Sequence, residues 1–328
     1  MVLNTLVILY ELEADGRQIV SDALDGSAEA IYLADLDDAG RARALGEADA
    51  VLARTTRELR QGEIALLKDI RLLQFINAGI DFVPLAELPA GVPVATNGGA
   101  YAAPMAEHAL AMALAAAKRL LVEHTALARG EFNQFARNRM LAGGVCGILG
   151  FGGIGEAMAR LARGIGMKVH AINRRGRSDE PTDWIGTPDQ LDALLAASDL
   201  LVICTPLTPA TRGMIGAARL ARMKDDAILV NLARGEIVDE HALYERLVAH
   251  PNFYACIDAW WIEPIRHGTF RMDQPFMSLP NVIGSPHNSA AAIAGTGAVG
   301  LQRAIANVRR ALAGETPLYL VPPEDRMM

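Results

Sequence analysis

The sequence contains few cysteines and few aromatic residues. Only 3 of the 328 residues are cysteine, and aromatic residues make up 5% of the chain. The cysteines lie far apart among apolar neighbours and none belongs to a CxxC pair, which argues against a disulfide framework or a cysteine-based metal site. They are typical of small buried side chains in a reducing compartment. We therefore expect no bound metal.

Long apolar runs and basic patches are also missing. No apolar stretch is long and uninterrupted enough to cross a bilayer. The short run at 6–10 lacks a basic leader and a small-residue cleavage site, which indicates a first strand and not a signal peptide. With 31 basic and 38 acidic residues, the formal charge is −7. Nucleic acids and membranes are therefore not expected as partners, and a cytoplasmic location is the default.

What the sequence does have is length and apolar content. A chain of 328 residues is sufficient for about two domains of ~150 residues each. Apolar residues make up 51% and charged residues 21%, a balance typical of a globular protein with sizeable cores.

Short apolar runs alternate with helical patterns in two successive blocks. Strands are expected at 6–10, 30–33, 50–52, 72–76 and 92–95, then at 145–149, 168–172, 200–204, 227–231, 255–258 and 282–284. Helices are expected at 16–23, 60–68, 104–121, 155–165, 187–197 and 290–312. The helix at 187–197 has an N-cap, a first-turn proline and a capping-box glutamine in Thr187-Pro188-Asp189-Gln190. Continuous apolar strands separated by helices indicate parallel sheets covered on both faces, so the fold class is α/β.

One glycine-rich turn follows the expected strand 145–149. Its sequence is Gly150-Phe151-Gly152-Gly153-Ile154-Gly155, which has the spacing GxGxxG between a strand and a helix. In such a turn the first glycine permits the tight bend, the second lets the backbone approach a pyrophosphate, and the third lets helix and strand pack closely. The helix N-terminus then offers N–H groups and a positive dipole end to the phosphates. The turn predicts a dinucleotide site.

The end of the next strand bears on the choice of dinucleotide. NAD-specific sites usually place an acidic residue there, which accepts hydrogen bonds from the ribose 2′-OH. This chain has Asn173, followed by Arg174, Arg175 and Arg177. A neutral side chain and three guanidinium groups favour a 2′-phosphate, although a solvated surface run is the alternative explanation. We expect NADP(H) as the preferred cofactor, with NAD(H) as a second option.

Three polar residues follow expected strand ends, the edge where open α/β sheets bind ligands. They are Arg234, Glu263 and His287. Each alone is explained as well by an ordinary surface or core role. Their common position beside a dinucleotide turn favours catalysis.

Three ordered motifs carry a family resemblance. They are CTPLTPAT at 204–211, NLARGEIVDE at 231–240 and SPH at 285–287. With them the chain resembles the D-isomer-specific 2-hydroxyacid dehydrogenases, and within these the glyoxylate/hydroxypyruvate reductase branch. The resemblance implies an oxidoreductase that reduces a small 2-oxo acid to a D-2-hydroxy acid by hydride transfer.

The same resemblance implies roles for single residues. His287 would be the general acid, Glu263 would orient its imidazole and stabilise the protonated form, and Arg234 would bind the substrate carboxylate and polarise the ketone. The loop containing Ala78, Gly79 and Ile80 would offer backbone N–H groups to that carboxylate. The remaining implied residues would contact the cofactor: Asp258 at the nicotinamide carboxamide, with Thr205, Pro206 and Leu232 as neighbours.

The resemblance also implies how the chain is divided. We expect a discontinuous, flavodoxin-like substrate domain of residues 1–97 with 288–328, and a Rossmann nucleotide-binding domain of residues 98–287. Family members are commonly homodimers, which would here use the long helix and an arm at 129–140. The arm has Phe132 and Phe135 where many relatives carry tryptophan, and Trp260-Trp261 and 266–272 also depart from the common form.

Two other functions are compatible with this architecture. A formate or phosphite dehydrogenase shares the architecture, but the formate enzymes have glutamine at the position of Glu263. A dinucleotide-sensing regulatory protein on the same scaffold would retain much of the catalytic set, so the motifs alone leave that alternative open.

Overall fold

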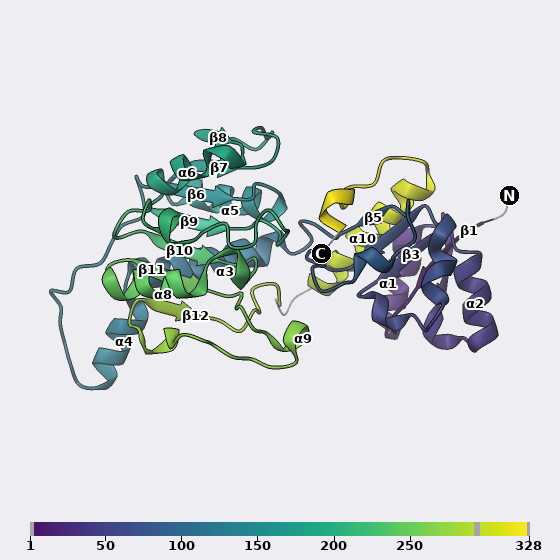
Figure 1. Cartoon of the computed structure of the whole chain (residues 1–328), viewed down its shortest axis with the longest axis horizontal. Helices are drawn as coiled ribbons and strands as arrows, with labels where there is room; N and C mark the ends of the chain where they lie inside the picture. Colours follow the sequence, from purple (N-terminus) through teal and green to yellow (C-terminus); the bar gives the residue numbers. More distant parts are fainter. Residues whose placement is uncertain (1–2, 292–295, 327–328) are drawn as a thin grey trace. The chain divides into compact units, whose positions relative to one another are not determined.

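The computed structural model describes residues 3–291 and 296–326. The chain divides into two compact units: unit 1 is Met1–Tyr101 with Ile293–Met328, and unit 2 is Ala102–Ala292. Figure 1 shows the elements of both. The structure therefore has a discontinuous unit and a continuous one, with boundaries at 101/102 and 292/293 beside the expected 97/98 and 287/288.

Unit 1 contains a five-stranded parallel sheet in the order β2-β1-β3-β4-β5. Its strands are β1 (Asn4–Ile8), β2 (Ala28–Tyr32), β3 (Ala50–Ala53), β4 (Leu72–Phe75) and β5 (Val94–Ala95). The five expected strands are confirmed, with small shifts at their ends. The order is that of flavodoxin-like sheets, whose direction of winding changes between β1 and β3.

Both faces of this sheet are buried because successive side chains of a strand point to opposite sides. Leu6 and Ile8 of β1 belong to a cluster with the helices α1 (Ala14–Leu24) and α10 (Thr296–Leu312). Val7 belongs to the other cluster, with residues of α2 (Asp38–Gly46). The expected helix 60–68 is instead a run of 3₁₀ turns, Glu63–Asp69. It begins only after Gly62, whose φ of 86° is not helical.

Unit 2 contains a seven-stranded parallel sheet in the order β12-β11-β10-β9-β6-β7-β8. Its strands are β6 (Val145–Leu149), β7 (Lys168–Ile172), β8 (Trp184–Gly186), β9 (Leu200–Ile203), β10 (Ile228–Asn231), β11 (Tyr254–Ile257) and β12 (Val282–Gly284). Counted from β6 the order is 3-2-1-4-5-6-7, the Rossmann arrangement with one added strand. All six expected strands are confirmed. β8 was not predicted because it is a three-residue edge strand without an apolar run.

Unit 2 also contains helices. They are α3 (Ala102–Ala117), α4 (Leu120–Ala128), α5 (Gly153–Gly164), α6 (Leu191–Ala197), α7 (Ala217–Leu220), α8 (Glu240–Ala249) and α9 (Pro264–His267). Of these, α3, α5 and α6 pack on strands of its sheet. The capping box of Thr187 and Gln190 is confirmed, and its proline-containing 3₁₀ turn leads into α6. In the part of the chain that the structure describes, no helix has both the length and the apolar character needed to cross a membrane.

The prediction of one long helix at 104–121 was wrong. The structure has two helices, α3 and α4, separated at Lys118 and Arg119, and Arg119 has a φ of 55°. The chain returning from the arm binds at this break: the N–H of Arg139 donates to the Ala117 carbonyl at 2.8 Å, and Lys118 Nζ donates to the Arg139 carbonyl at 2.8 Å. The carbonyl of Ala117, at the end of α3, therefore bonds to the arm and not to the next turn of a helix. Helical propensity alone does not reveal this contact.

The expected C-terminal helix 290–312 starts later than predicted. Ala290 and Ala291 are not helical, and α10 is Thr296–Leu312. The intervening residues 292–295 lie outside the described residues.

Candidate active site

The glycine-rich turn joins β6 to α5 where the strand order of unit 2 reverses, between β6 and β9. Gly150 has a φ of 98°, and a Cβ there would lie 2.5 Å from the backbone nitrogen of Thr205. A Cβ on Gly155 would lie 2.5 Å from the Gly150 carbonyl oxygen. Only glycine fits either position. A dinucleotide binds at this kind of crossover in Rossmann sheets.

The second glycine has a different setting. Gly152 is the N-cap of α5, and no atom lies within 4 Å of a Cβ built on it. The open space beside the first N–H groups of the helix fits a pyrophosphate. The helix starts at Gly153, two residues before the expected start, so Gly153 and Ile154 contribute first-turn N–H groups.

The turn after β7 is closed by the side chain of Asn173. Its Nδ2 donates to the Arg177 carbonyl at 2.9 Å, and its Oδ1 accepts from the Arg175 N–H at 2.9 Å. Arg174, Arg175 and Arg177 are all exposed. The asparagine therefore shapes the turn from which the three arginines extend.

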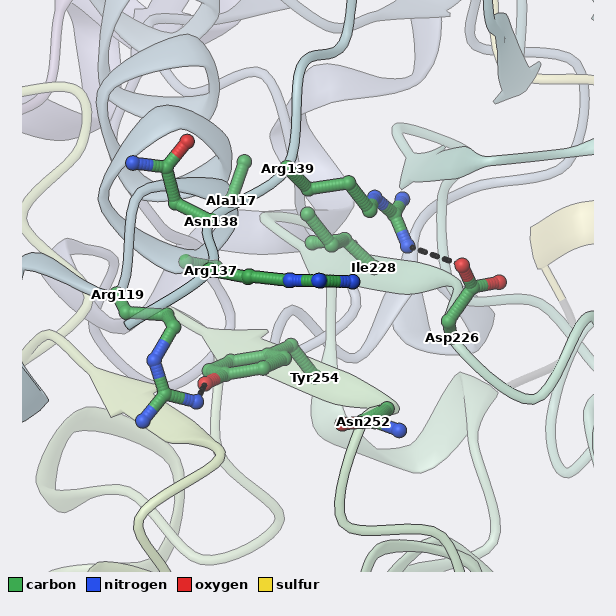
Figure 2. A pocket seen from close by; sticks show the side chains of 10 residues that line it. Ala117, Arg119, Arg137, Asn138, Arg139, Asp226, Ile228, Asn252 and Tyr254 are labelled. Carbon is green, nitrogen blue, oxygen red and sulfur yellow. Dashed lines mark hydrogen bonds and ion pairs between the residues drawn. The ribbon is translucent and has the colours of Figure 1, made fainter. Parts of the chain in front are cut away.

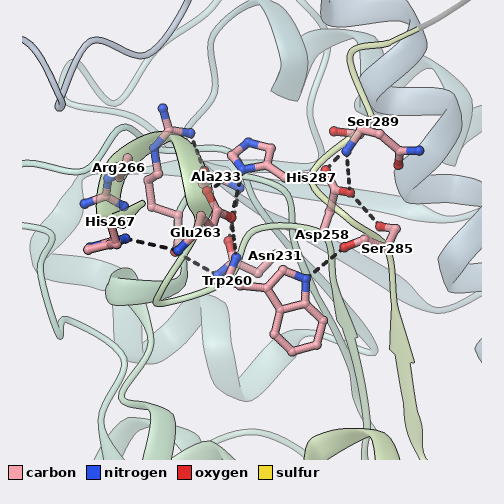
Figure 3. A network of polar contacts seen from close by, with 12 residues as sticks. Asn231, Ala233, Asp258, Trp260, Glu263, Arg266, His267, Ser285, His287 and Ser289 are labelled. Carbon is pink, nitrogen blue, oxygen red and sulfur yellow. Dashed lines mark hydrogen bonds and ion pairs between the residues drawn. The ribbon is translucent and has the colours of Figure 1, made fainter. Parts of the chain in front are cut away.

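Loops after three neighbouring strands meet at the same edge of the sheet. His287, which follows β12, places Nδ1 2.8 Å from both carboxylate oxygens of Glu263, which follows β11. The Glu263 side chain is only 9% exposed, whereas that of His287 is 32% exposed. Figure 3 shows the ring held by the carboxylate from one side. Since Nδ1 faces Glu263, the other ring nitrogen is left to exchange protons elsewhere.

The surroundings of Glu263 favour its ionised form. Burial opposes ionisation, but the hydrogen bond and charge of His287 outweigh it, helped by the Trp260 N–H at 2.7 Å and by the charge of Arg234. The pKa of Glu263 is therefore lowered from its ordinary value. An ionised carboxylate accepts a proton-bearing Nδ1, which fixes the tautomer of the neutral ring.

His287 adopts an uncommon backbone conformation. Its φ is 51°, in the left-handed region. Histidine is enriched among the few residue types that adopt this conformation, and such positions concentrate at functional sites. No sequence signal marks the position beyond the proline before it.

Asp258, fully buried at the end of β11, anchors the segment that carries His287. Its carboxylate accepts from Ser285 Oγ at 2.6 Å and from the N–H groups of Asn288 and Ser289 at 3.2 and 3.3 Å. These bonds hold the chain on both sides of His287. Ser285 was part of the predicted histidine motif, but its bond to Asp258 was not foreseen. The predicted contact of Asp258 with a nicotinamide carboxamide stays a prediction.

The loop after β10 carries Arg234, which is half-buried. Asn231 closes this loop: its Nδ2 donates to the Arg234 carbonyl at 2.8 Å and its Oδ1 accepts from the Ala233 N–H at 3.1 Å. A Cβ on Gly235 would lie 2.5 Å from the backbone of Trp260 and Trp261. The loops after β10 and β11 are thus in backbone contact. Thr205, Pro206 and Leu232 lie at the ends of β9 and β10 along the same edge.

The aromatic pair packs in the core of unit 2. Trp260 is buried and Trp261 packs against the same cluster, stacked on Phe276 with 5.4 Å between ring centroids. The indole nitrogens donate to the carbonyls of Ser285 and Val238, both at 2.8 Å. Both indoles are therefore fixed by packing and hydrogen bonds within unit 2.

The predicted carboxylate-binding loop belongs to unit 1 and follows β4. Asn77 donates from Nδ2 to the Arg54 carbonyl at 2.8 Å, and its own carbonyl accepts from the Asn97 N–H at 2.9 Å. Ala78 and Gly79 are half-buried and Ile80 is buried. The loop is therefore held on both sides by other residues of unit 1.

A cavity that was not predicted lies at the opposite, amino-terminal edge of the unit 2 sheet. It has a volume of about 220 Å³ and is lined by Ala116, Ala117, Arg119, Arg137, Asn138, Arg139, Asp226, Ile228, Asn252 and Tyr254. Figure 2 shows Arg137 lying across it. Two of its arginines are paired: Arg119 with Glu123 at 3.1 Å and Arg139 with Asp226 at 3.3 Å. The cavity is separate from the edge that carries His287.

Comparison with known proteins identifies the family. Residues 110–289 match the model of the NAD binding domain of D-isomer specific 2-hydroxyacid dehydrogenases. A hydroxypyruvate reductase of Thermotoga maritima is 30% identical over 78% of this chain and 82% of its own length. The chain belongs to the D-isomer specific 2-hydroxyacid dehydrogenase family.

Solved structures of D-2-hydroxyacid dehydrogenase architecture agree. A D-isomer specific 2-hydroxyacid dehydrogenase of Xanthobacter autotrophicus Py2, in complex with NADPH, has a TM-score of 0.79 at 26% identity, covering 99% of both chains. A putative formate dehydrogenase of Pyrobaculum aerophilum has a TM-score of 0.80 at 26% identity, covering 98% of this chain and 99% of that one. The predicted family and fold class are confirmed.

A dehydrogenase of this family uses a nicotinamide dinucleotide, and the turn at Gly150 fits that cofactor. The regulatory alternative is not favoured, because the relatives are named as reductases and dehydrogenases. The structure brings Glu263 and His287 together and places Arg234 on an adjoining loop. The roles of the single residues stay predictions.

Proposed function

We propose that this D-2-hydroxyacid dehydrogenase reduces small 2-oxo acids, such as glyoxylate or hydroxypyruvate, to the corresponding 2-hydroxy acids, with the D configuration wherever the product is chiral. The contact between His287 Nδ1 and the Glu263 carboxylate, at 2.8 Å, carries the proposal. It is the arrangement expected of a general acid whose proton leaves from the other ring nitrogen.

The chemistry needs one hydride and one proton. A reduced nicotinamide dinucleotide, held at the turn of Gly150, Gly152 and Gly155, would supply the hydride for the carbonyl carbon of the 2-oxo acid. His287, protonated on both nitrogens, releases the Nε2 proton to the carbonyl oxygen, so the C=O double bond becomes a C–OH single bond. Glu263 stabilises the charged ring before transfer, and Arg234 binds the substrate carboxylate through its planar fork. Ala78, Gly79 and Ile80 would offer backbone N–H groups to the same carboxylate.

Formate oxidation fits the site less well. That reaction removes a hydride from formate and leaves carbon dioxide, so no carbonyl oxygen needs a proton. The paired carboxylate and imidazole of this chain are suited to a substrate whose oxygen is protonated.

We propose that the preferred cofactor is NADPH. Asn173 adds no negative charge beside the ribose, and it closes a turn that exposes Arg174, Arg175 and Arg177. Guanidinium groups bind phosphate through charge-assisted hydrogen bonds worth about 1.5–3 kcal/mol each. Arg174→Ala should therefore raise the KM for NADPH about tenfold or more and change the KM for NADH little. Equal losses with both cofactors would refute the preference.

We also propose a homodimer formed through α4 and the arm at 129–140. This segment exposes several large apolar side chains, among them Phe132 at 78% and Phe135 at 83%, and clustered exposure of this kind marks interaction surfaces. The cavity lined by Arg137 lies beside the arm, so a second copy would cover it. Sedimentation should show a dimer, and replacing both phenylalanines with serine should give a monomer. A monomeric wild-type protein would contradict this proposal.

Turnover tests the central proposal. Purified protein is mixed with NADPH or NADH, and the nicotinamide absorbance is followed with glyoxylate, hydroxypyruvate, pyruvate and phenylpyruvate. We expect loss of absorbance with at least one 2-oxo acid. With the three substrates other than glyoxylate, whose product glycolate is achiral, a chiral assay should find the D product. No turnover with any of the four would reject the proposed activity.

A further inference from the structure

The short helix α9 begins directly after Glu263, in a segment whose sequence departs from the common form of the family. Glu263 is its N-cap, and the N–H groups of Arg266 and His267 donate to the Glu263 carbonyl at 3.2 and 2.8 Å. Any movement of α9 would therefore move Glu263. The side chains of Arg266 and His267 show what holds the helix in place.

Arg266 connects α9 to the loop that carries Arg234. Its Nη1 and Nη2 donate to the two carboxylate oxygens of Glu236 at 2.9 and 2.5 Å. Glu236 lies in a 3₁₀ turn, Gly235–Ile237, whose N-cap is Arg234. The Arg266 and Glu236 side chains are only 12% and 15% exposed. A bidentate pair of this geometry fixes direction as well as distance.

His267 holds Glu263 from the same helix. Its Nδ1 accepts the Glu263 backbone N–H at 3.0 Å, while the His267 N–H binds the Glu263 carbonyl. Both backbone polar groups of Glu263 are thus bonded to one residue. Figure 3 shows Arg266 and His267 on the side of Glu263 away from His287.

We propose that Arg266 and Glu236 are positioning residues that lock the loop of the substrate-binding Arg234 to the loop of the proton-relaying Glu263. This inference rests on the proposed function of those residues. The backbone contact of Gly235 with Trp260 and Trp261, and the bond from Trp261 Nε1 to the Val238 carbonyl, join the loops before Glu263. The ion pair joins them again at Arg266, after Glu263, and so holds the segment that carries Glu263 from its other side. The pair thereby sets the distance between the group that binds the carboxylate and the group that serves the carbonyl.

A double-mutant cycle tests the lock. Arg266→Gln and Glu236→Gln should each lower kcat/KM by about ten- to a hundredfold, since small displacements of positioned groups cost about that much. The loss should appear in kcat as well as in KM, because both loops are displaced. The double variant should lose no more than either single variant, since residues that act as a unit are not additive. The affinity for NADPH, measured by nicotinamide fluorescence, should stay within about twofold of wild type.

Arg271→Gln is the matched control. Arg271 follows α9 in the same segment and pairs with Asp273, but both side chains are well exposed, at 63% and 50%. Exposed pairs contribute little, so this variant should keep wild-type kcat and KM. Arg266→Lys is the second variant if the glutamine variants fail to fold. It keeps the charge and loses the fork, and should fall between wild type and the expected loss for Arg266→Gln.

A second measurement separates positioning from stability and does not need turnover. The ¹⁵N chemical shift of His287 Nδ1 reports its hydrogen bond to Glu263. It should move in Arg266→Gln and Arg266→Lys and stay at the wild-type value in Arg271→Gln.

The outcomes are distinct. Non-additive kinetic losses with a displaced His287 resonance support the lock. Wild-type kcat, KM and His287 resonance in Arg266→Lys or in the glutamine variants, with only a lower urea midpoint, overturn it. A wild-type protein without turnover rejects the proposed function, and the His287 resonance then decides alone whether Arg266 holds the Glu263 loop.

Discussion

The two parallel sheets of this protein present different chemistry at their carboxyl-terminal edges. In unit 2, the carboxylates of Glu263 and Asp258 are held by several donors, and Glu263 faces an imidazole. In unit 1, the edge carries Glu58, whose Oε2 is buried without a hydrogen-bond partner among the described residues. The surroundings of Glu263 favour its ionised form, whereas burial disfavours the ionised form of Glu58.

Two ionisable groups of unit 1, Glu58 and Tyr10, show this effect of burial. Burial raises the pKa of Glu58 more than backbone hydrogen bonds and Arg54 lower it. Burial likewise raises the pKa of Tyr10 to about 12, although the Arg54 guanidinium lies 4.3 Å from the centre of its ring. The strand order of a sheet does not determine whether a carboxyl group at its carboxyl-terminal edge is stable in the ionised form. Neighbouring donors decide it.

The largest effect is expected from breaking the contact between His287 and Glu263 in unit 2. His287→Asn should lower kcat by about 10²–10⁴-fold, the usual contribution of a general acid. Asparagine tolerates the left-handed backbone found at position 287, so the loop should keep its shape. Steady-state kinetics and NADPH titration check this together. Wild-type kcat, or loss of NADPH binding with chemistry intact, would contradict the role given to His287.

The next effect concerns the glycine-rich turn between β6 and α5. Gly150→Ala should destabilise the protein by about 3 kcal/mol and abolish dinucleotide binding, because its φ of 98° strains an alanine and the new Cβ would overlap the backbone of Thr205. Gly152→Ala is the control, with open space and a φ of −121°. It should change stability by no more than about 0.5 kcal/mol yet weaken dinucleotide binding. Urea unfolding and NADPH titration measure both; equal destabilisation by the two variants would argue against the turn geometry.

Glu263→Gln should lower stability by about 2 kcal/mol at neutral pH. The folded pKa of Glu263 lies below the unfolded value, so its contribution is present above the unfolded pKa and lost as the pH falls through the folded one. The gap between wild type and variant should therefore close in acid. Urea midpoints at several pH values test this, with exposed Glu87→Gln as the control. A gap that widens in acid would reverse the assignment.

The smallest effect, of opposite sign, is expected in unit 1. The folded pKa of Glu58 lies above the unfolded value, so its contribution is full below the unfolded pKa and is lost as the pH rises through the folded one. Glu58→Gln should therefore raise stability at neutral pH, by less than about 1 kcal/mol, and lose this advantage in acid. The same urea series measures it. Destabilisation at neutral pH would show that ionised Glu58 is better solvated than its buried Oε2 suggests.

Much of the fold followed from the sequence because buried parallel strands are continuous apolar runs. Strands such as β6 and β9 have this pattern, and the missed β8 does not. The break at Arg119 could not be predicted, since it depends on Arg139, which returns to the end of α3 from across the arm. Local propensity favours one helix there, and a tertiary contact ends it.

The sequence predicted which residues form the candidate site but not the hydrogen bonds and ion pairs that hold them in place. Arg234, Glu263 and His287 were found because each follows a strand. The left-handed backbone of His287, the anchoring of its segment by Asp258 and the pairing of Arg266 with Glu236 gave no periodic or motif signal. Contacts between loops depend on how neighbouring strands are registered, which a single sequence does not encode in any local pattern.

The division of unit 1 between the two ends of the chain has a consequence during synthesis. Its sheet is completed on one face by α10, where Asn307 Nδ2 donates to the buried Gln74 Oε1 at 2.7 Å. The ribosome makes β1 before unit 2, but it makes α10, which covers part of β1, only after unit 2. Unit 2 is one unbroken stretch and can acquire its whole core in between. Although domains usually fold in the order of their synthesis, here the strands of unit 1 must wait, partly uncovered, for α10.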